Sequence, residues 1–369
     1  MTKHKVLIPI HPDKCDLADH LPEFKKFQQT FDVHIEVLTT SENFIHALKT
    51  KYNDIAAVWA TSSLYKLGGL NPFIDYLPDT VKVVAFPWVG HNAFDGKKLK
   101  ERGIILANIG DSPSKDVADI ALLLTLATFR YSSYLEHALR TSDASISEAR
   151  DSFGSDSFDP KTGEPIPPED IKHKNLAKKL TIGGKTLDSP ANKVAGLVGL
   201  GSIGKEIAKR LDAIGMSIKY TKRTPLKPEE EEALPFKAEF YSSFEELIPH
   251  VDLLVIAVPH SESTINLINK DSVKLLKKNV RIVNIGRGTA IDEDILLEAL
   301  DDGTVNSVGL DVFQNEPKID KRFLNRWDVV ILPHIGSFTV DNFRDANIRV
   351  IENIEDVLLH DGPSLSPVN

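Results

Sequence analysis

The chain has 369 residues, of which 41% are hydrophobic and 26% charged, and its formal net charge is -9 at pH 7. This length exceeds the usual size of one domain, so we expect two. The negative charge disfavours nucleic acid and anionic membranes as partners, and no apolar run reaches the roughly 20 residues of a membrane span. A single cysteine, Cys15, leaves no internal disulfide or cysteine metal cluster. We therefore expect no metal, and, without a signal-peptide pattern, a cytoplasmic location.

The first part of the chain alternates short apolar runs with amphipathic segments, which is typical of an α/β fold with a parallel sheet. The pattern predicts helices at 21–31 and 43–51, and strands at 5–10, 34–38, 56–60, 81–86 and 104–107. A long helix is predicted over 116–140, with apolar residues on all its faces. Such a helix should be largely buried, partly across the interface of a homodimer.

The composition changes at residues 142–190, which are polar and rich in Ser, Asp, Gly, Pro and Lys. Loops of this length are uncommon in compact folds. We interpret the segment as a surface insertion with one short helix at 169–179 and no chemical role.

Strands and helices alternate again from residue 193, and this repeat predicts a second doubly wound unit. The predicted helices are 203–214 and 292–302, and the strands are 193–198, 217–221, 253–258, 281–285, 307–311 and 329–332. The last helix, 339–360, should return to the first unit. The expected fold is therefore α/β with two doubly wound domains. Residues 1–110 and 338–369 form a smaller flavodoxin-like substrate domain, and 111–337 form a Rossmann-type dinucleotide-binding domain that carries the 142–190 insertion.

A G-x-G-x-x-G motif follows the predicted strand 193–198 and begins the next helix. Its glycines are Gly199, Gly201 and Gly204, with Ser202 and Ile203 between the last two. The first glycine allows a tight turn, the second allows close approach of a pyrophosphate, and the third allows the helix to pack on the strand. The motif is weak evidence alone, but this strand-to-helix context favours dinucleotide binding over a turn without a ligand.

The end of the next strand should select the cofactor. NAD enzymes usually place a carboxylate there, about 20 residues beyond the glycines, to bind the ribose hydroxyls. This chain has Thr221, Lys222, Arg223 and Thr224 instead. Two cations and two hydroxyls suit the 2′-phosphate of NADP, although NAD stays possible and the cations could also be solvated loop charges.

Three side chains with complementary chemistry follow strands of the second unit. Arg287, Glu316 and His334 should lie in the ligand crevice at the carboxyl ends of these strands. Each alone could be structural, since an Arg–Glu pair is often a surface ion pair and a lone His is often only hydrogen-bonded. Together they offer a cation for a carboxylate, a proton donor for a carbonyl oxygen, and a group that keeps the donor protonated.

These motifs, with their order, resemble the D-isomer-specific 2-hydroxyacid dehydrogenases, from about residue 81 to the end. The insertion before the glycine turn is similar to the D-mandelate dehydrogenase branch, whereas the cofactor loop resembles the glyoxylate/hydroxypyruvate reductases. The resemblance implies that Arg287 binds substrate, that His334 binds substrate and is the acid/base, and that Glu316 holds its imidazole. It also implies a substrate-carboxylate site at the amides of Val89 and Gly90. Further implied cofactor contacts are Ser114, Ser202, Ile203, Val258, Pro259, Ile285, Gly286, Asp311 and Gly336.

Two residues depart from the family pattern near the implied carboxylate site. Trp88 stands where the family commonly has glycine, and Asn92 stands where it has aspartate. A tryptophan beside this site could narrow the pocket, so it puts bulky substrates such as mandelate in doubt.

The sequence thus predicts an enzyme that reduces a small 2-oxo acid, such as glyoxylate or hydroxypyruvate, to the D-2-hydroxy acid with NADPH. The first alternative is an NAD-dependent dehydrogenase of aromatic or branched D-2-hydroxy acids. The second is a nucleotide-sensing interaction protein similar to the transcriptional corepressors that share this fold. The net charge disfavours that second alternative.

Overall fold

The computed structural model describes residues 3–12, 16–91, 93–159, 161–166 and 180–369. It divides into two compact units, one of Met1–Pro113 with Ser337–Asn369 and the other of Ser114–Gly336. The predicted helix 169–179, Cys15 and Asn92 lie outside the described residues. Among the described residues, no helix is long and apolar enough to cross a membrane, and no cluster of His, Cys, Asp or Glu could hold a metal.

The first unit has a five-stranded parallel sheet in the order β2-β1-β3-β4-β5, which is the flavodoxin-like order. Alternate residues of β1 enter two apolar clusters, with Leu7 on one face and Val6 and Ile8 on the other. Because helices cover both faces, the strand is apolar throughout rather than alternating. The elements are β1 (Lys5–Ile10), α1 (Pro22–Thr30), β2 (Asp32–Val37), α2 (Ser41–Thr50), β3 (Ala57–Trp59), β4 (Val83–Ala85), α3 (Gly96–Glu101), β5 (Ile105–Ala107) and α11 (Val340–His360).

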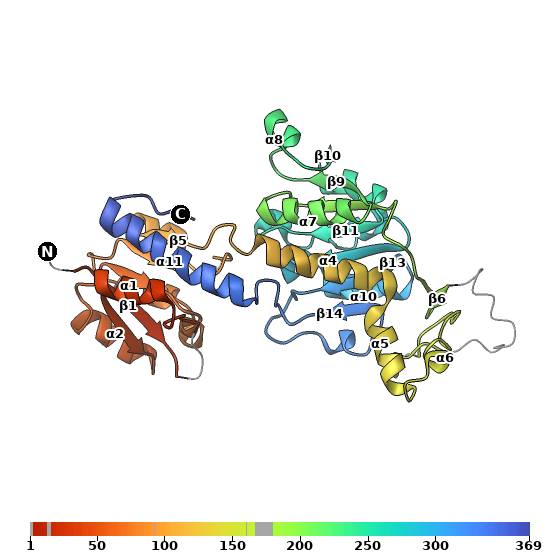
Figure 1. Ribbon diagram of the computed structural model, residues 1–369, viewed down its shortest axis with the longest axis horizontal. Helices are drawn as coiled ribbons and strands as arrows, with labels where there is room; N and C mark the ends of the chain where they lie inside the picture. The colour runs from red at the N-terminus through yellow and green to blue at the C-terminus, as the bar shows by residue number, and fades with distance from the viewer. Residues whose placement is uncertain (1–2, 13–15, 92, 160, 167–179) are drawn as a thin grey trace. The chain divides into compact units, whose positions relative to one another are not determined.

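The C-terminal helix α11 packs against α1 and β4 of the first unit, and Figure 1 shows it in blue beside the red α1. Its buried residues Ala346, Val350 and Ile354 follow helical spacing and join the same apolar cluster as α1. The end of the chain therefore belongs to the first unit.

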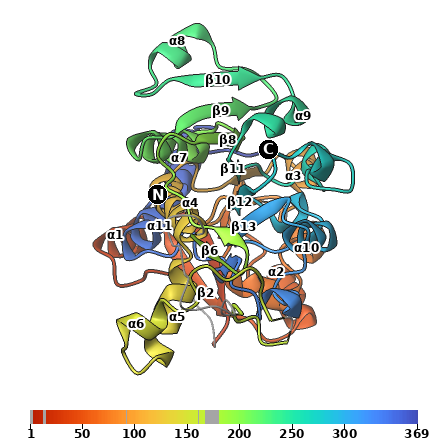
Figure 2. The same cartoon turned by 90° about the vertical axis from the view of Figure 1, so that its right-hand side faces the viewer.

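The second unit has a seven-stranded parallel sheet in the order β10-β9-β8-β11-β12-β13-β14. Figure 2 shows α4 and α7 on one side of this sheet and α10 on the other. This is the doubly wound arrangement that the sequence predicted. Its main elements are α4 (Ser114–Arg130), α5 (Ser132–Thr141), β8 (Val194–Val198), α7 (Ser202–Ala213), β9 (Ser217–Thr221), α8 (Pro228–Glu232), β10 (Ala238–Tyr241), α9 (Phe244–Leu247), β11 (Leu253–Ile256), β12 (Val280–Asn284), α10 (Glu293–Asp301), β13 (Val305–Leu310) and β14 (Val329–Ile331).

Two details of the second unit differ from the prediction. The single helix predicted over 116–140 is wrong, because Tyr131 adopts a left-handed conformation (φ 52°) and separates α4 from α5. Leu123 and Leu126 of α4 are exposed in the single chain, and burial across a homodimer interface stays a prediction. The edge strand β10 was not predicted, because it is short and half exposed and so lacks a continuous apolar run.

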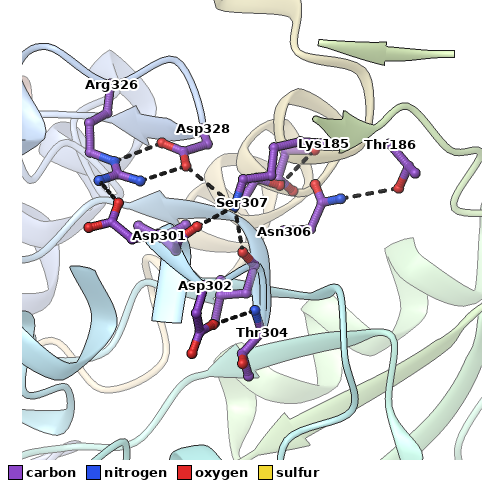
Figure 3. Close-up of polar contacts among 12 residues, drawn as sticks. Lys185, Thr186, Asp301, Asp302, Thr304, Asn306, Ser307, Arg326 and Asp328 are labelled. Atoms are coloured by element: carbon purple, nitrogen blue, oxygen red, sulfur yellow. Dashed lines mark hydrogen bonds and ion pairs between the residues drawn. The ribbon is translucent and has the colours of Figure 1, made fainter. Parts of the chain in front are cut away.

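The described part of the 142–190 segment is joined to the sheet of the second unit by polar contacts. It contains α6 (Ile146–Ala149) and a two-stranded hairpin of β6 (Thr181–Ile182) and β7 (Lys185–Thr186). The ammonium of Lys185 donates to the carbonyls of Leu300 and Val305 and lies 3.7 Å from a carboxylate oxygen of Asp328 (Figure 3). The hairpin is therefore joined to the sheet at the amino ends of β13 and β14, the edge opposite the predicted crevice.

Candidate active site

Arg287 follows β12 in a turn that a buried asparagine shapes. The Asn284 amide donates to the Arg287 carbonyl at 2.9 Å, and its carbonyl oxygen accepts from the Gly286 amide at 3.1 Å. The Arg287 guanidinium donates to the Gly286 carbonyl at 2.6 Å. The turn therefore presents this cation at the carboxyl edge of the sheet. Asn284 was not among the predicted site residues, although a polar side chain at the end of a buried strand needs hydrogen-bond partners and so marks a special position.

Glu316 and His334 form a hydrogen-bonded pair at the same edge. Nδ1 of His334 lies 2.8 Å from Oε2 of Glu316, and the other oxygen, Oε1, accepts from the Phe313 amide at 3.0 Å. Both carboxylate oxygens are thus engaged, and the imidazole is oriented with Nε2 away from this pair. That second nitrogen is the one left to meet a ligand.

The pair and its surroundings shift both pKa values. The hydrogen bond to Glu316 raises the pKa of His334, against the opposing effect of burial. Burial alone would raise the pKa of Glu316, but the hydrogen bonds with His334 and with the Phe313 amide lower it overall. The charge of Arg287 lowers both pKa values, so this cation acts on the same site. The arrangement favours an imidazolium held by a carboxylate.

Asp311 holds the backbone that carries His334. Its carboxylate accepts from the amides of Ile335 and Gly336, each at 2.8 Å. His334 itself has a left-handed backbone (φ 54°), which is costly for a residue with a side chain and needs such support. A Cβ at Gly336 would lie 3.0 Å from a carboxylate oxygen of Asp311, so a larger residue there would push against this carboxylate. Burial raises the pKa of Asp311, although these two amides oppose that shift.

The glycine turn has the geometry that the motif requires. Gly199 has φ +97°, and a Cβ there would lie 2.8 Å from the Ala257 carbonyl oxygen. A Cβ at Gly204 would lie 2.3 Å from the Gly199 carbonyl oxygen, whereas one at Gly201 would meet nothing within 4 Å. The turn is thus crowded where helix and strand meet and open where a pyrophosphate would approach. Helix α7 begins there, at Ser202 and Ile203, without a side-chain cap.

Two further observations fit a dinucleotide. The hydroxyl of Ser114, at the start of α4, is buried and has no hydrogen-bond partner within the described residues. A buried hydroxyl without a partner is unfavourable unless a ligand completes it. Gly286 is crowded against the β11 loop, since a Cβ there would lie 2.7 Å from the Val258 carbonyl oxygen. Val258, Pro259 and Ile285 therefore lie at neighbouring strand ends, as the cofactor prediction requires.

The predicted cofactor-selecting loop follows β9. Thr221 is buried, Lys222 is half-buried, and Arg223 and Thr224 are exposed. Lys222 contributes to the field that lowers the pKa of Glu230 in α8, after the larger effect of the Lys227 amide. Arg223 has no ion-pair partner within the part of the chain that the structure describes. Of the four predicted residues, Arg223 is therefore the most accessible cation.

The implied substrate-carboxylate residues belong to the first unit. The Val89 carbonyl accepts from the Asn108 side-chain amide at 2.8 Å, which orders the turn that contains Val89 and Gly90. Trp88 packs its ring among Tyr65, Phe86 and Phe94. These contacts direct the indole into the apolar cluster of its own unit. The expectation that Trp88 narrows a substrate pocket gains no support from this packing.

Comparisons with known proteins show the family to which this chain is similar. Residues 171–336 match the family model described as "D-isomer specific 2-hydroxyacid dehydrogenase, NAD binding domain". Glyoxylate reductase 1 of Saccharomyces cerevisiae is 30% identical over 87% of this chain and 83% of its own length. A glyoxylate reductase of Thermococcus gammatolerans is 35% identical over 70% of this chain and 68% of its own length.

Solved structures give the same result at the level of the fold. The holo form of Rhodotorula graminis D-mandelate dehydrogenase is similar with a TM-score of 0.83 and 30% identity, over 100% of this chain and 98% of that one. A glyoxylate reductase of Paecilomyes thermophila is similar with a TM-score of 0.80 and 26% identity, over 100% of this chain and 99% of that one. The chain therefore belongs to the D-isomer-specific 2-hydroxyacid dehydrogenases, a family of NAD(P)-dependent oxidoreductases.

Proposed function

We propose that this enzyme uses NADPH to reduce a small 2-oxo acid, of the glyoxylate or hydroxypyruvate class, to the D-2-hydroxy acid. The observation that carries the cofactor choice is the end of β9, where Arg223 is exposed and Thr221 takes the place of a carboxylate. A carboxylate there would repel a 2′-phosphate, whereas a guanidinium binds it. In support, an NADPH-dependent glyoxylate/hydroxypyruvate reductase of Sinorhizobium meliloti, solved with NADP and malonate, is similar at 26% identity with a TM-score of 0.74.

The proposed mechanism assigns one task to each residue of the site. Bound NADPH would supply the hydride that reduces the substrate's carbonyl carbon. Arg287 would pair its planar guanidinium with the substrate carboxylate and so fix the carbonyl in place. His334, whose Nδ1 faces Glu316, would donate a proton from Nε2 to the carbonyl oxygen. Glu316 would stabilise the imidazolium before that transfer, and the neutral imidazole would be reprotonated from solvent afterwards.

The test of cofactor preference is the ratio of kcat/KM with NADPH to kcat/KM with NADH, on one substrate at fixed low salt. One charge-assisted contact to the 2′-phosphate is worth about 1.5–3 kcal/mol, or about 10- to 150-fold in affinity. We expect the wild type to favour NADPH and Arg223→Ala to lose most of that preference with little change toward NADH. Lys209→Ala, which removes an exposed cation from α7, is the matched control and should keep the ratio. A wild-type ratio that favours NADH would refute the proposal.

A second candidate is an NAD-dependent dehydrogenase of larger D-2-hydroxy acids. It is favoured by the full-length similarity to D-mandelate dehydrogenase and by a relative named 4-methyl-2-oxopentanoate reductase A, of Aspergillus oryzae, at 29% identity. A panel of glyoxylate, hydroxypyruvate, 4-methyl-2-oxopentanoate and phenylglyoxylate against both cofactors separates the two candidates. Turnover of none of these acids would contradict both.

A further inference from the structure

The first residue of α10, Glu293, has a buried side chain that the proposed mechanism does not use. It is 6% exposed, and its Oε1 accepts a hydrogen bond from the Gln314 amide at 2.8 Å. Capping of the helix does not require it, because the neighbouring Asp292 accepts from the amides of Asp294 and Ile295. Burial of a carboxylate costs free energy. The contact between Glu293 and the Gln314 amide should therefore have a purpose other than helix capping.

That contact fixes the segment that carries Glu316, the carboxylate partner of His334. Gln314 directly follows Phe313, whose own amide donates to Glu316 at 3.0 Å, and Glu316 in turn holds His334 at 2.8 Å. Two successive amides are thus bound by two carboxylates, one from α10 and one from the site. Displacement of this backbone would move the anchor of Glu316 directly.

The same backbone also supports the turn that carries Arg287. A Cβ placed on the adjacent Gly288 would lie 1.8 Å from the carbonyl carbon of Phe313 and 2.4 Å from the Gln314 nitrogen. The two turns are therefore packed backbone to backbone, with no room for a side chain. A shift of the peptide between Phe313 and Gln314 would therefore displace both the turn that carries Arg287 and the side chain of Glu316.

We propose that Glu293 is a positioning residue for the reaction: it holds the Phe313–Gln314 peptide, and through it orients Glu316 toward His334. This inference rests on the proposed roles of Glu316 and His334. Glu293 does not touch the reacting atoms; it acts through the backbone. Its carboxylate lies in the field of Asp320, Arg322 and Asp294, and burial raises its pKa.

The test compares three substitutions at this position. Glu293→Ala removes the acceptor, Glu293→Asp withdraws it by one methylene, and Glu293→Gln keeps an oxygen acceptor of the same reach. We expect kcat to fall about 10- to 100-fold in Glu293→Ala, since misplacement of a reacting group by about 1 Å has this scale of effect. Glu293→Asp should show a smaller loss, and Glu293→Gln should stay near wild type. The matched control is Glu298→Ala, which removes an exposed carboxylate from the same helix.

A second measurement distinguishes positioning from general destabilisation. In protein labelled at histidine, nuclear magnetic resonance follows the titration of His334, with its signal assigned by its absence in His334→Ala. The His334 titration should move to lower pH in Glu293→Ala and stay unchanged in Glu298→Ala, because a displaced Glu316 stabilises the imidazolium less. Glu293→Asp provides the same reading if the alanine variant does not fold.

A double-mutant cycle with Glu316→Gln completes the test. If Glu293 acts through Glu316, the second substitution adds little to the first, and the losses in kcat are not additive. Additive losses, or a His334 titration unchanged in both Glu293→Ala and Glu293→Asp, would overturn the inference. The titration needs no substrate, so it still decides the role of Glu293 if the wild type reduces none of the 2-oxo acids offered.

Discussion

The hydrogen bond between Glu316 and His334 predicts in which direction the pH dependence of kcat/KM changes when Glu316 loses its charge. Glu316→Gln preserves the shape of the side chain and removes its charge. Because Glu316 raises the pKa of His334, the wild-type imidazolium persists to higher pH than an ordinary histidine would allow. The proposed mechanism needs that imidazolium as proton donor, so kcat/KM for the 2-oxo acid should be full below the His334 pKa and fall as pH rises through it. In Glu316→Gln this fall should begin at lower pH.

The size of the effect follows from the geometry. A hydrogen bond between charged groups at 2.8 Å is worth about 1.5–3 kcal/mol when shielded from water. The side chains of His334 and Glu316 are 52% and 36% exposed, so solvent screening reduces this to about 0.5–1.5 kcal/mol. The expected loss in reduction rate above the His334 pKa is therefore about 2- to 12-fold, with a smaller loss at low pH.

The assay is the initial rate of NADPH oxidation from pH 5 to 9, with substrate well below KM. Oxidation of the D-2-hydroxy acid provides an internal control, because it needs the neutral imidazole as base and should rise with pH. In Glu316→Gln that rise should also begin at lower pH. The fall of the reduction rate and the rise of the oxidation rate should therefore both shift to lower pH. An unchanged profile in both directions would refute the assignment of His334 and Glu316 as the acid/base pair.

The other residues give three further predictions. His334→Ala should lower kcat about 10²- to 10⁴-fold with nearly intact NADPH affinity, and near-normal turnover by the folded variant would contradict its role. Arg287→Ala should raise KM for the 2-oxo acid and lower kcat, and Arg287→Lys should recover only part of the loss, because lysine lacks the planar fork; full recovery would reduce Arg287 to a nearby charge. Lys185→Met should lower the free energy of unfolding by about 1–3 kcal/mol, since it leaves the Leu300 and Val305 carbonyls without their donor; thermal melts measure the change, and an unchanged melting temperature would show that the hairpin contact is dispensable.

The sequence was most informative where one rule governs both local structure and chemistry. In a doubly wound sheet every parallel strand ends at the same edge, so residues after separate strands must gather there. Arg287, Glu316 and His334 were predicted from this rule, and the structure brings Glu316 and His334 within 2.8 Å of each other. The glycine turn was equally predictable, because a side chain at Gly199 or Gly204 would clash with neighbouring backbone, so the residue type itself indicates the turn.

The sequence was less informative where tertiary contacts decide. Tyrosine is a residue type that helices accept, and no glycine or proline lies at the break between α4 and α5 to predict it. Its hydroxyl bonds to Asn306 of β13, 175 residues away, so a distant partner accompanies that break. Lys185 was likewise assigned to a polar insertion, since nothing local shows that backbone carbonyls of α10 and β13 surround its ammonium.

Carboxylates illustrate the same limit within the site. Glu293 has the position of a favourable acidic residue in the first turn of a helix, a role that an exposed glutamate would fill equally well. Asp311 was predicted only as a cofactor contact, and the structure shows in addition that its two oxygens accept from the amides of Ile335 and Gly336. Residue type and position predict a hydrogen-bonding or electrostatic role for each of these two carboxylates. The partner of each, however, is a backbone amide from a distant part of the chain. Since any residue except proline can supply that amide, the pairing leaves no trace in the sequence, and the supporting residues of an active site are harder to predict than the groups that carry out its chemistry.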